Sequence, residues 1–388
     1  MPPQLSITEG LGSAISTNIL LGIAIAAVAS LLISLVPLLQ KTQGLCALCI
    51  IAAAAFYRQA FTGFGMVILA AYLVMRWLNH GTPGSRRWHW ACISLLFLVG
   101  IFTLGRVLHW DRPFNPTGTV PIVVYSLDMW LLLRLATLFW EVGSGAIQPL
   151  SVSQFLIWTC LPFTIGGPLL RPSQMPRLNV SHPGIWISPA WWLEMLQAAG
   201  KLLAVVAMAR GQHLLYSVFP QHAVNSLVVA FIVGPLGFYL TTSAYFQFME
   251  LLGRPCGFKL PPSFNLPIGR ENISSFWMNW NMTATFVFRD YLFYNRWGRS
   301  SYNLYFNTIL LFTLVGLWHA ANAYWVMWGF FHGLLFVTFL LWRKYNGRFN
   351  IPWRGTALSG LSARVLTYAS VCICWYLPSK LLQKLAGL

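Results

Sequence analysis

The stretch LLFTLVGLWHAANAYWVMWGFFHG (residues 310–333) places two histidines, His319 and His332, inside an apolar, aromatic-rich run. An ionisable side chain at membrane depth is costly, at about 2.5–3.5 kcal/mol for the charged types on insertion scales, so such a residue is a candidate functional residue. Histidine is also the side chain best suited to move a proton near neutral pH. We therefore predict that His319 is the chemical centre of the protein.

The composition around this stretch is that of a membrane protein. The chain has 388 residues, of which 57% are hydrophobic and 9% are charged, and its mean hydropathy is +0.63. A soluble domain carries about 25% charged residues. The apolar runs are long and unbroken rather than alternating, which favours helices over a barrel. We predict an all-α integral membrane protein, a single polytopic domain over residues 1–388 with about ten or eleven membrane segments.

The formal net charge is +17, from 25 Lys and Arg against 8 Asp and Glu. Anchoring of basic loops against anionic lipid explains such a charge in many membrane proteins. A second interpretation is that part of the charge meets an acidic partner, such as a phosphorylated acyl donor or an acidic carrier protein. Composition alone leaves both interpretations open.

Several segments are not expected to be simple spans. Residues 162–171 hold prolines and glycines at the end of an apolar run, which indicates either an interrupted helix or an ordinary helix end. Residues 250–272 hold four Pro and three Gly, so we expect a loop. Residues 273–297 are aromatic and amphipathic, which favours interfacial or re-entrant helices. The predicted spans are residues 18–39, 46–57, 62–78, 88–108, 119–140, 152–170, 189–209, 222–249, 303–319, 322–342 and 361–379.

Four motifs stand out along the chain. They are GGPLLR (residues 166–171), GFKLPPSFNLP (257–267), FWMNWN followed by FRDYL (276–292), and GLWHA followed by WGFFHG (316–333). Their order, over more than half of the chain, resembles that of the membrane-bound O-acyltransferase (MBOAT) family, and in particular its bacterial branch that acylates polysaccharides and teichoic acids.

The resemblance implies a helical ring around a central tunnel, with residues 119–342 as the catalytic core. It implies that His319 is the catalytic histidine and that Asn281 fills the second active-site position. Substrate-binding, donor-binding or supporting roles fall to His332, Trp318, Trp280, Arg289, Asp290, Arg171 and Asn265. The polysaccharide branch usually has His at position 281 and basic residues at positions 278 and 279. This chain has Asn281, Met278 and Asn279.

The chemistry implied is transfer of an acyl group from a thioester to a hydroxyl. A neutral His319 would remove the hydroxyl proton, and Asn281 could donate to the acyl carbonyl or orient the acceptor. The sequence shows no GxSxG nucleophile motif, paired carboxylates or metal-ligand cluster, so we expect direct transfer without a bound cofactor or metal. The acyl donor would be acyl-CoA or an acyl carrier protein.

A glycan or other cell-envelope polymer is the preferred acceptor, which would place the protein in a bacterial inner membrane. Because this chain has Asn281, a hydroxyl of a lipid, a sterol-like molecule or a small secondary metabolite is an alternative acceptor. An endoplasmic reticulum membrane is then an alternative location. Other expected partners are membrane lipids and an acidic carrier protein or accessory acyltransferase, but not nucleic acid. A proton-coupled transporter is the competing class, because broken helices and buried histidines suit both. A non-catalytic membrane scaffold is a third class.

His332 follows His319 by 13 positions, about 220° around an unbroken helix. The two rings would then not share a face, which gives His332 a structural or supporting role. Arg289 and Asp290 are expected to form an ion pair, because charges near a membrane persist only when satisfied.

Overall fold

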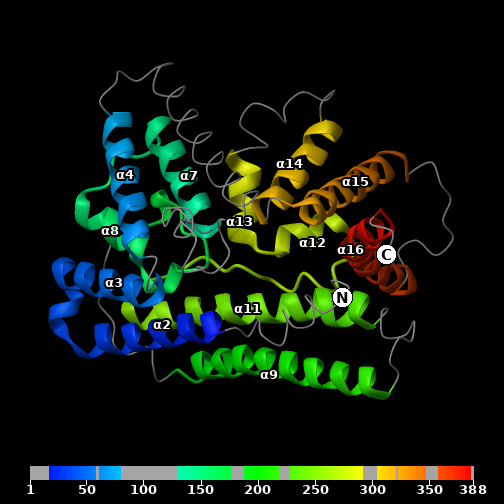
Figure 1. Cartoon of the computed structure of the whole chain (residues 1–388), viewed down its shortest axis with the longest axis horizontal. Helices are drawn as coiled ribbons and strands as arrows, with labels where there is room; N and C mark the ends of the chain where they lie inside the picture. Colours follow the sequence, from blue (N-terminus) through cyan, green and yellow to red (C-terminus); the bar gives the residue numbers. More distant parts are fainter. Residues whose placement is uncertain are drawn as a thin grey trace. The chain divides into compact units, whose positions relative to one another are not determined.

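The computed structural model describes residues 17–57, 61–79, 129–175, 188–218, 228–291, 304–319, 322–346 and 357–385. Every regular element in these ranges is a helix, which confirms the predicted all-α class (Figure 1). The predicted span 88–108 lies outside the described residues. The described chain divides into two compact units. The first comprises Thr17–Leu196 with Tyr245–Pro261, and the second comprises Gln197–Ala244 with Pro262–Leu388.

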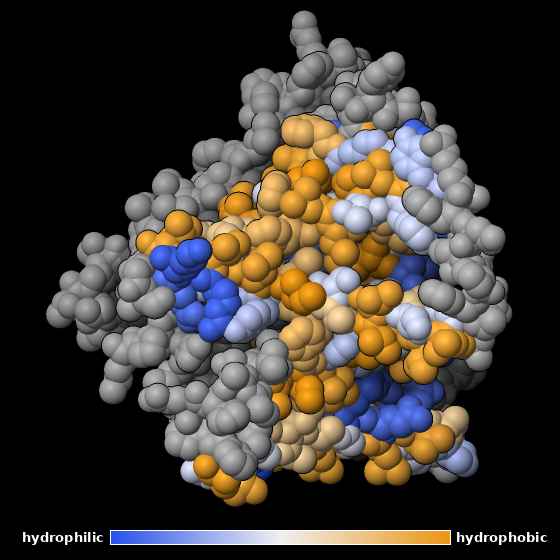
Figure 2. All heavy atoms as spheres, turned by 90° about the vertical axis from the view of Figure 1, so that its right-hand side faces the viewer, coloured by the Kyte–Doolittle hydropathy of each residue, from blue (hydrophilic) through white to orange (hydrophobic). Residues whose placement is uncertain are grey.

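Four of the described helices are long and apolar enough to cross a membrane, covering Phe61–Leu78, Pro189–Leu214, Ala323–Tyr345 and Leu358–Leu385. Three shorter apolar helices cover Ile19–Leu35, Thr42–Tyr57 and Leu304–His319. Among the coloured residues in Figure 2, hydrophobic side chains predominate on the face displayed, and hydrophilic groups form separate patches. Large apolar side chains exposed in this way are typical of a protein whose surroundings are lipid.

The first unit is built from helices that follow the early apolar runs. They are α2 (Thr17–Leu35), α3 (Thr42–Tyr57), α4 (Phe61–Asn79), α7 (Met129–Gly143) and α8 (Val152–Cys160). Helix α3 packs on α2 and α8, and α4 packs on α7. Ser151 begins α8 with a capping box, in which its hydroxyl and the Gln154 side chain bond each other's backbone amides.

The segment predicted as either an interrupted helix or a helix end is interrupted. Helix α8 stops at Cys160, and a short 3₁₀ turn (Pro162–Thr164) is followed by buried irregular backbone. Gly167 has φ of 114°, which favours glycine, and a β-carbon there would collide with the Phe246 ring. The Trp158 indole donates to the Leu170 carbonyl at 3.1 Å. Irregular backbone is therefore satisfied against protein, as it must be at membrane depth.

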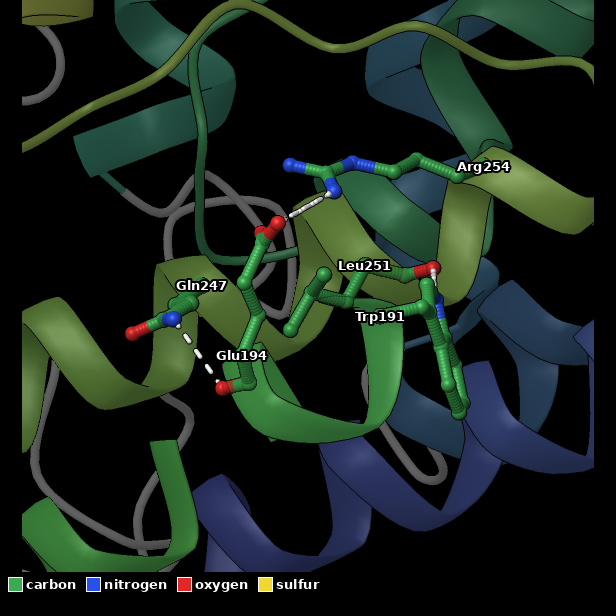
Figure 3. A network of polar contacts seen from close by, with 5 residues as sticks. All are labelled: Trp191, Glu194, Gln247, Leu251 and Arg254. Carbon is green, nitrogen blue, oxygen red and sulfur yellow. Dashed lines mark hydrogen bonds and ion pairs between the residues drawn. The ribbon is translucent and has the colours of Figure 1, made fainter. Parts of the chain in front are cut away.

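The start of α9 (Pro189–Val218) lies beside the end of α11 (Gly234–Gly253) in the first unit (Figure 3). The Trp191 indole donates to the Leu251 carbonyl at 3.0 Å, and the Gln247 amide donates to the Glu194 carbonyl at 3.1 Å. Arg254, just past α11, pairs with the Glu194 carboxylate at 2.9 Å. Two of these bonds use backbone carbonyls, so they fix how far one helix can slide along the other.

The second unit holds the histidine stretch. Helices α14 (Leu304–His319) and α15 (Ala323–Tyr345) form an antiparallel hairpin (Figure 1), which confirms the predicted pair of segments. Helix α15 also packs on α12 (Ile273–Asn279) and on α16 (Ala357–Leu385), and α13 (Met282–Val287) follows α12. Two short helices in place of one long span agree with the interfacial or re-entrant prediction for residues 273–297, of which those after 291 lie outside the described ranges.

Glycines let the two helices of the hairpin approach closely. A β-carbon on Gly316 would collide with the Trp325 carbonyl oxygen, and one on Gly329 would collide with the Phe312 carbonyl oxygen. A β-carbon on Gly333 would lie 2.7 Å from the Ile309 Cα. Small residues at such contacts are the usual device for tight helix pairing in membranes.

Candidate active site

His319 is the last residue of α14, and its imidazole lies among tryptophan rings. It stacks on Trp325 with ring centroids 4.6 Å apart and an interplanar angle of 21°. Its centroid lies 4.7 Å from that of Trp318 and 5.6 Å from that of Trp328. The residue is of intermediate exposure, and no hydrogen bond of either ring nitrogen is found among the described residues. The imidazole is therefore oriented by its contacts with aromatic rings.

His332 occupies a different environment, with no exposed surface. Its Nδ1 donates to the Trp328 carbonyl oxygen at 2.8 Å, because a carbonyl can only accept. One unbroken helix from His319 to His332, the case considered from the sequence, is wrong, because α14 ends at His319 and α15 begins after its N-cap, Asn322. As a result both imidazoles contact the same ring: His332 lies 4.2 Å from Trp328, centroid to centroid.

Trp328 links the two histidines to α12. Its ring lies 5.8 Å from that of Trp277, which in turn lies 5.3 Å from the His332 ring. Within the described residues, Nε2 of His332 and the indole N–H groups of Trp277 and Trp328 are buried without a hydrogen-bond partner. Three buried polar groups close together are costly in a purely apolar core. Their clustering marks this region as polar despite its aromatic walls.

Asn281 occupies the break between α12 and α13. Its backbone is left-handed, with φ of 41° and ψ of 54°, a conformation that Asn tolerates better than most residues. Trp280, just before it, is buried and stacks on Phe276 at 5.3 Å. Asn281 is itself only partly buried, and its side-chain oxygen lies 3.5 Å from the Thr283 hydroxyl. The break thus anchors a tryptophan in the core and presents the next side chain.

Two backbone hydrogen bonds hold the preceding loop against this break. The Asn265 amide donates to the Asn279 carbonyl at 3.0 Å, and the Met282 amide donates to the Ser263 carbonyl at 2.7 Å. One bond lies on each side of Asn281, so the GFKLPPSFNLP loop and the Asn281 turn form one structure. Asn265, which the sequence placed among the site residues, takes part through its backbone.

The other predicted site residues are distributed between both units. Trp318 is buried and packs on Phe288 at 5.4 Å, in the same unit as His319. Arg289 and Asp290 form the predicted ion pair at 2.7 Å, and the Arg289 guanidinium lies 4.6 Å over the Phe286 ring. Arg171 belongs to the first unit, where its amide donates to the Gln174 side chain at 3.3 Å. The Leu292 end of the FRDYL motif lies outside the described residues.

Sequence reasoning did not select Trp325, Trp328 and Trp277 as site residues, although all three surround the histidines. One signal could have found two of them. Trp325, Trp328 and His332 follow an i, i+3, i+7 spacing, which places them on one face of a helix. In the described part of the chain, no group of three or more His, Cys, Asp and Glu side chains is arranged to hold a metal ion.

Comparison with known proteins finds homologues of the chain. No family model matches the chain. The teichoic acid D-alanyltransferase of Bacillus subtilis (strain 168) is 31% identical over 137 residues, which cover 32% of this chain and 33% of that protein. A Pseudomonas aeruginosa protein named probable alginate O-acetylase AlgI is 35% identical over 98 residues, or 25% of this chain and 19% of that protein. The chain is a homologue of bacterial MBOAT enzymes that acylate polymers.

A longer match extends the relation beyond one segment. The teichoic acid D-alanyltransferase of Streptococcus thermophilus is 24% identical over 275 residues, covering 65% of this chain and 65% of that protein. The matches thus span from a fifth to about two thirds of these MBOAT relatives. The resemblance drawn from the four motifs is confirmed, and the all-helical, apolar fold agrees with it.

Proposed function

We propose that this protein is a membrane-embedded O-acyltransferase that moves an acyl group from a thioester to a hydroxyl of a cell-envelope polymer. The observation that carries the proposal is the homology to enzymes named for D-alanyl and acetyl transfer to such polymers. The site geometry supports it, because His319, whose ring makes no hydrogen bond to the described residues, lies in a largely apolar, aromatic setting. Exclusion of water from such a site would protect a thioester from hydrolysis.

His319 would act as the general base. The acceptor oxygen attacks the thioester carbonyl carbon while an unprotonated nitrogen of His319 takes the hydroxyl proton. The carbon–sulfur bond then breaks, and the imidazolium returns the proton to the departing thiolate. The products are an ester and a free thiol, and the enzyme regains its starting state without a covalent intermediate.

Asn281 would complete the site as a neutral hydrogen-bond donor. An amide cannot take the proton, but it can donate to the carbonyl oxygen as negative charge develops there, a contribution of about 3 kcal/mol for one well-placed donor. His332 is fully buried and bonded to its own helix, so it would act by holding Trp328 and thereby the His319 ring.

The donor and acceptor follow from the same proposal. The donor would be acyl-CoA or the thioester of an acyl carrier protein, and the excess of 25 basic over 8 acidic residues suits either acidic partner. The acceptor hydroxyl would belong to a glycan or another envelope polymer, which would place the protein in a bacterial inner membrane with an acidic carrier protein or accessory acyltransferase as partner.

The test is turnover by detergent-purified protein. Acyl-CoA species from acetyl to palmitoyl, and then a carrier-protein thioester, are offered with a membrane extract as acceptor. We expect ester formation by the wild type and a loss of about 10²–10⁴-fold in kcat for His319→Ala. His213→Ala changes an exposed histidine on α9 and serves as the matched control. Equal turnover by His319→Ala and wild type would reject His319 as base, and no turnover with either donor class would reject the activity.

A further inference from the structure

Arg270 lies at the end of the loop that precedes α12, and its side chain reaches three acceptors. Its Nη2 donates to the Asn265 carbonyl at 2.6 Å and to the Asn279 side-chain oxygen at 3.1 Å. Its Nε donates to the Leu266 carbonyl at 3.0 Å. One planar guanidinium thus joins the loop at residues 265–266 to the last residue of α12.

The orientation of the Asn279 amide is consistent with this arrangement. Its nitrogen donates to the Ser275 carbonyl at 2.8 Å, which turns its oxygen toward the guanidinium. A flipped amide would face a carbonyl with its oxygen and a guanidinium with its NH₂ group, and it would lose both bonds. The Asn279 side chain is therefore oriented to accept from Arg270, at a position where the polysaccharide branch of the MBOAT family usually has a basic residue.

The loop that Arg270 closes holds an unfavourable backbone conformation. Leu266 has φ of 46°, in the left-handed region that a leucine rarely adopts, and its side chain is largely exposed. Such a conformation persists only when the surroundings hold it. The Leu266 carbonyl accepts the bond from Arg270, so the guanidinium directly supports this turn.

The same loop is bonded to both sides of Asn281. The Asn265 amide reaches the Asn279 carbonyl before it, and the Ser263 carbonyl accepts from Met282 after it. We propose that Arg270 is a positioning residue that fixes the turn presenting Asn281, through an Arg270 clamp comprising Arg270, Asn265, Leu266 and Asn279. The inference rests on the proposed acyl transfer for its functional part and on the contacts alone for its structural part.

Two measurements separate these parts. Hydrogen–deuterium exchange of the full-length protein in detergent reports the turn itself, in peptides covering residues 263–283. Acyl transfer to acceptor, compared with hydrolysis of the thioester by water, reports whether Asn281 still directs the acceptor. For Arg270→Ala we expect faster exchange in these peptides and a loss of transfer of roughly 10- to 100-fold, because a small misplacement of a site group has that effect. Hydrolysis should fall less than transfer.

Arg364→Ala is the matched control. Arg364 pairs with Glu271, the neighbour of Arg270, at 3.0 Å, but both side chains are 53% exposed. Exposed ion pairs contribute little to stability, so both the exchange and the transfer of this variant should stay near those of the wild type. Arg270→Lys should retain more transfer than Arg270→Ala but less than the wild type, since an ammonium cannot donate to the Asn265, Leu266 and Asn279 acceptors in the planar geometry of a guanidinium. Asn279→Ala should resemble Arg270→Ala, and the double variant should be less than additive.

The outcomes are distinct. Unchanged exchange at residues 263–283 in Arg270→Ala overturns the clamp whether or not the protein is an acyltransferase. Faster exchange with undiminished transfer by an active protein overturns the positioning role. An inactive wild-type protein counts against the proposed function. In that case the hydrogen–deuterium exchange of Arg270→Ala alone tests whether the clamp holds the turn. If Arg270→Ala unfolds at a much lower temperature than the wild type, Arg270→Lys and Asn279→Ala become the test variants. Exchange and transfer at wild-type levels in both of them would overturn the proposal.

Discussion

At the scale of single residues, the two histidines of one motif differ in access. His319 is partly exposed, while His332 has no exposed surface and bonds the carbonyl one turn earlier in its own helix. Both contact Trp328, so the fully buried His332 packs on the ring against which His319 also lies. The spacing of the two histidines in the sequence cannot reveal this difference, because it depends on where α14 ends and α15 begins.

Their substitutions should therefore separate stability from activity. We expect His332→Ala to lower the free energy of unfolding by about 2–4 kcal/mol, since it removes a buried ring and leaves a cavity. His319→Ala should change stability far less while abolishing most turnover. Thermal unfolding in detergent, followed by tryptophan fluorescence, measures both variants. A wild-type unfolding temperature for His332→Ala would contradict its packing role.

At the scale of elements, short irregular segments place the site residues. The break at Asn281, the end of α14 at His319 and the end of α8 at Cys160 each stop a helix where a side chain or backbone group is presented. Proline and glycine content predicted the loop before α12, and it left an interrupted helix and an ordinary helix end both open near Gly167. The exact break at Asn281 was not predictable from propensity, because it depends on bonds from Ser263 and Asn265, which lie well before it in the chain.

The α14–α15 hairpin offers a direct test of close helix packing. In Gly329→Ala the new methyl group meets the Phe312 backbone, so we expect a loss of about 1–3 kcal/mol in stability. Gly200→Ala on α9 is the control, because a β-carbon there has open space within 4 Å. Alanine favours helix more than glycine, so the control should be neutral or slightly stabilising. Equal unfolding temperatures for the two variants would exclude the tight contact.

At the scale of the whole molecule, several described helices expose large apolar side chains. Leu196, Leu203 and Leu214 on α9 are 65–70% exposed, and Leu366 on α16 is 66% exposed. In water such surfaces would drive aggregation, whereas lipid makes them neutral. Composition predicted this environment correctly, since 9% charged residues cannot cover a soluble surface. The Arg270 clamp was beyond sequence reasoning, because nothing in the sequence says which of the basic residues points inward at carbonyls.

The lipid environment of α9 can be tested at Leu203, which is 70% exposed. A carboxylate at the centre of a spanning helix costs about 2.5–3.5 kcal/mol on insertion scales, so Leu203→Asp should reduce the membrane-integrated fraction. Leu203→Ala keeps an apolar side chain and should integrate as wild type. Carbonate extraction of membranes followed by blotting measures both. Full integration of Leu203→Asp would place this face of α9 against protein or water.

The hairpin that carries His319 joins segments that are neighbours in the chain, since Ile309 meets Gly333 and Gly316 meets Trp325. Contacts of such low sequence separation form fast and need no distant partner. A nascent chain can therefore close this hairpin during membrane insertion, before α16 has been synthesised. The His319 imidazole would then contact its tryptophan neighbours early in biogenesis. The segment that holds Asn281 precedes the hairpin in the chain and would already have been synthesised.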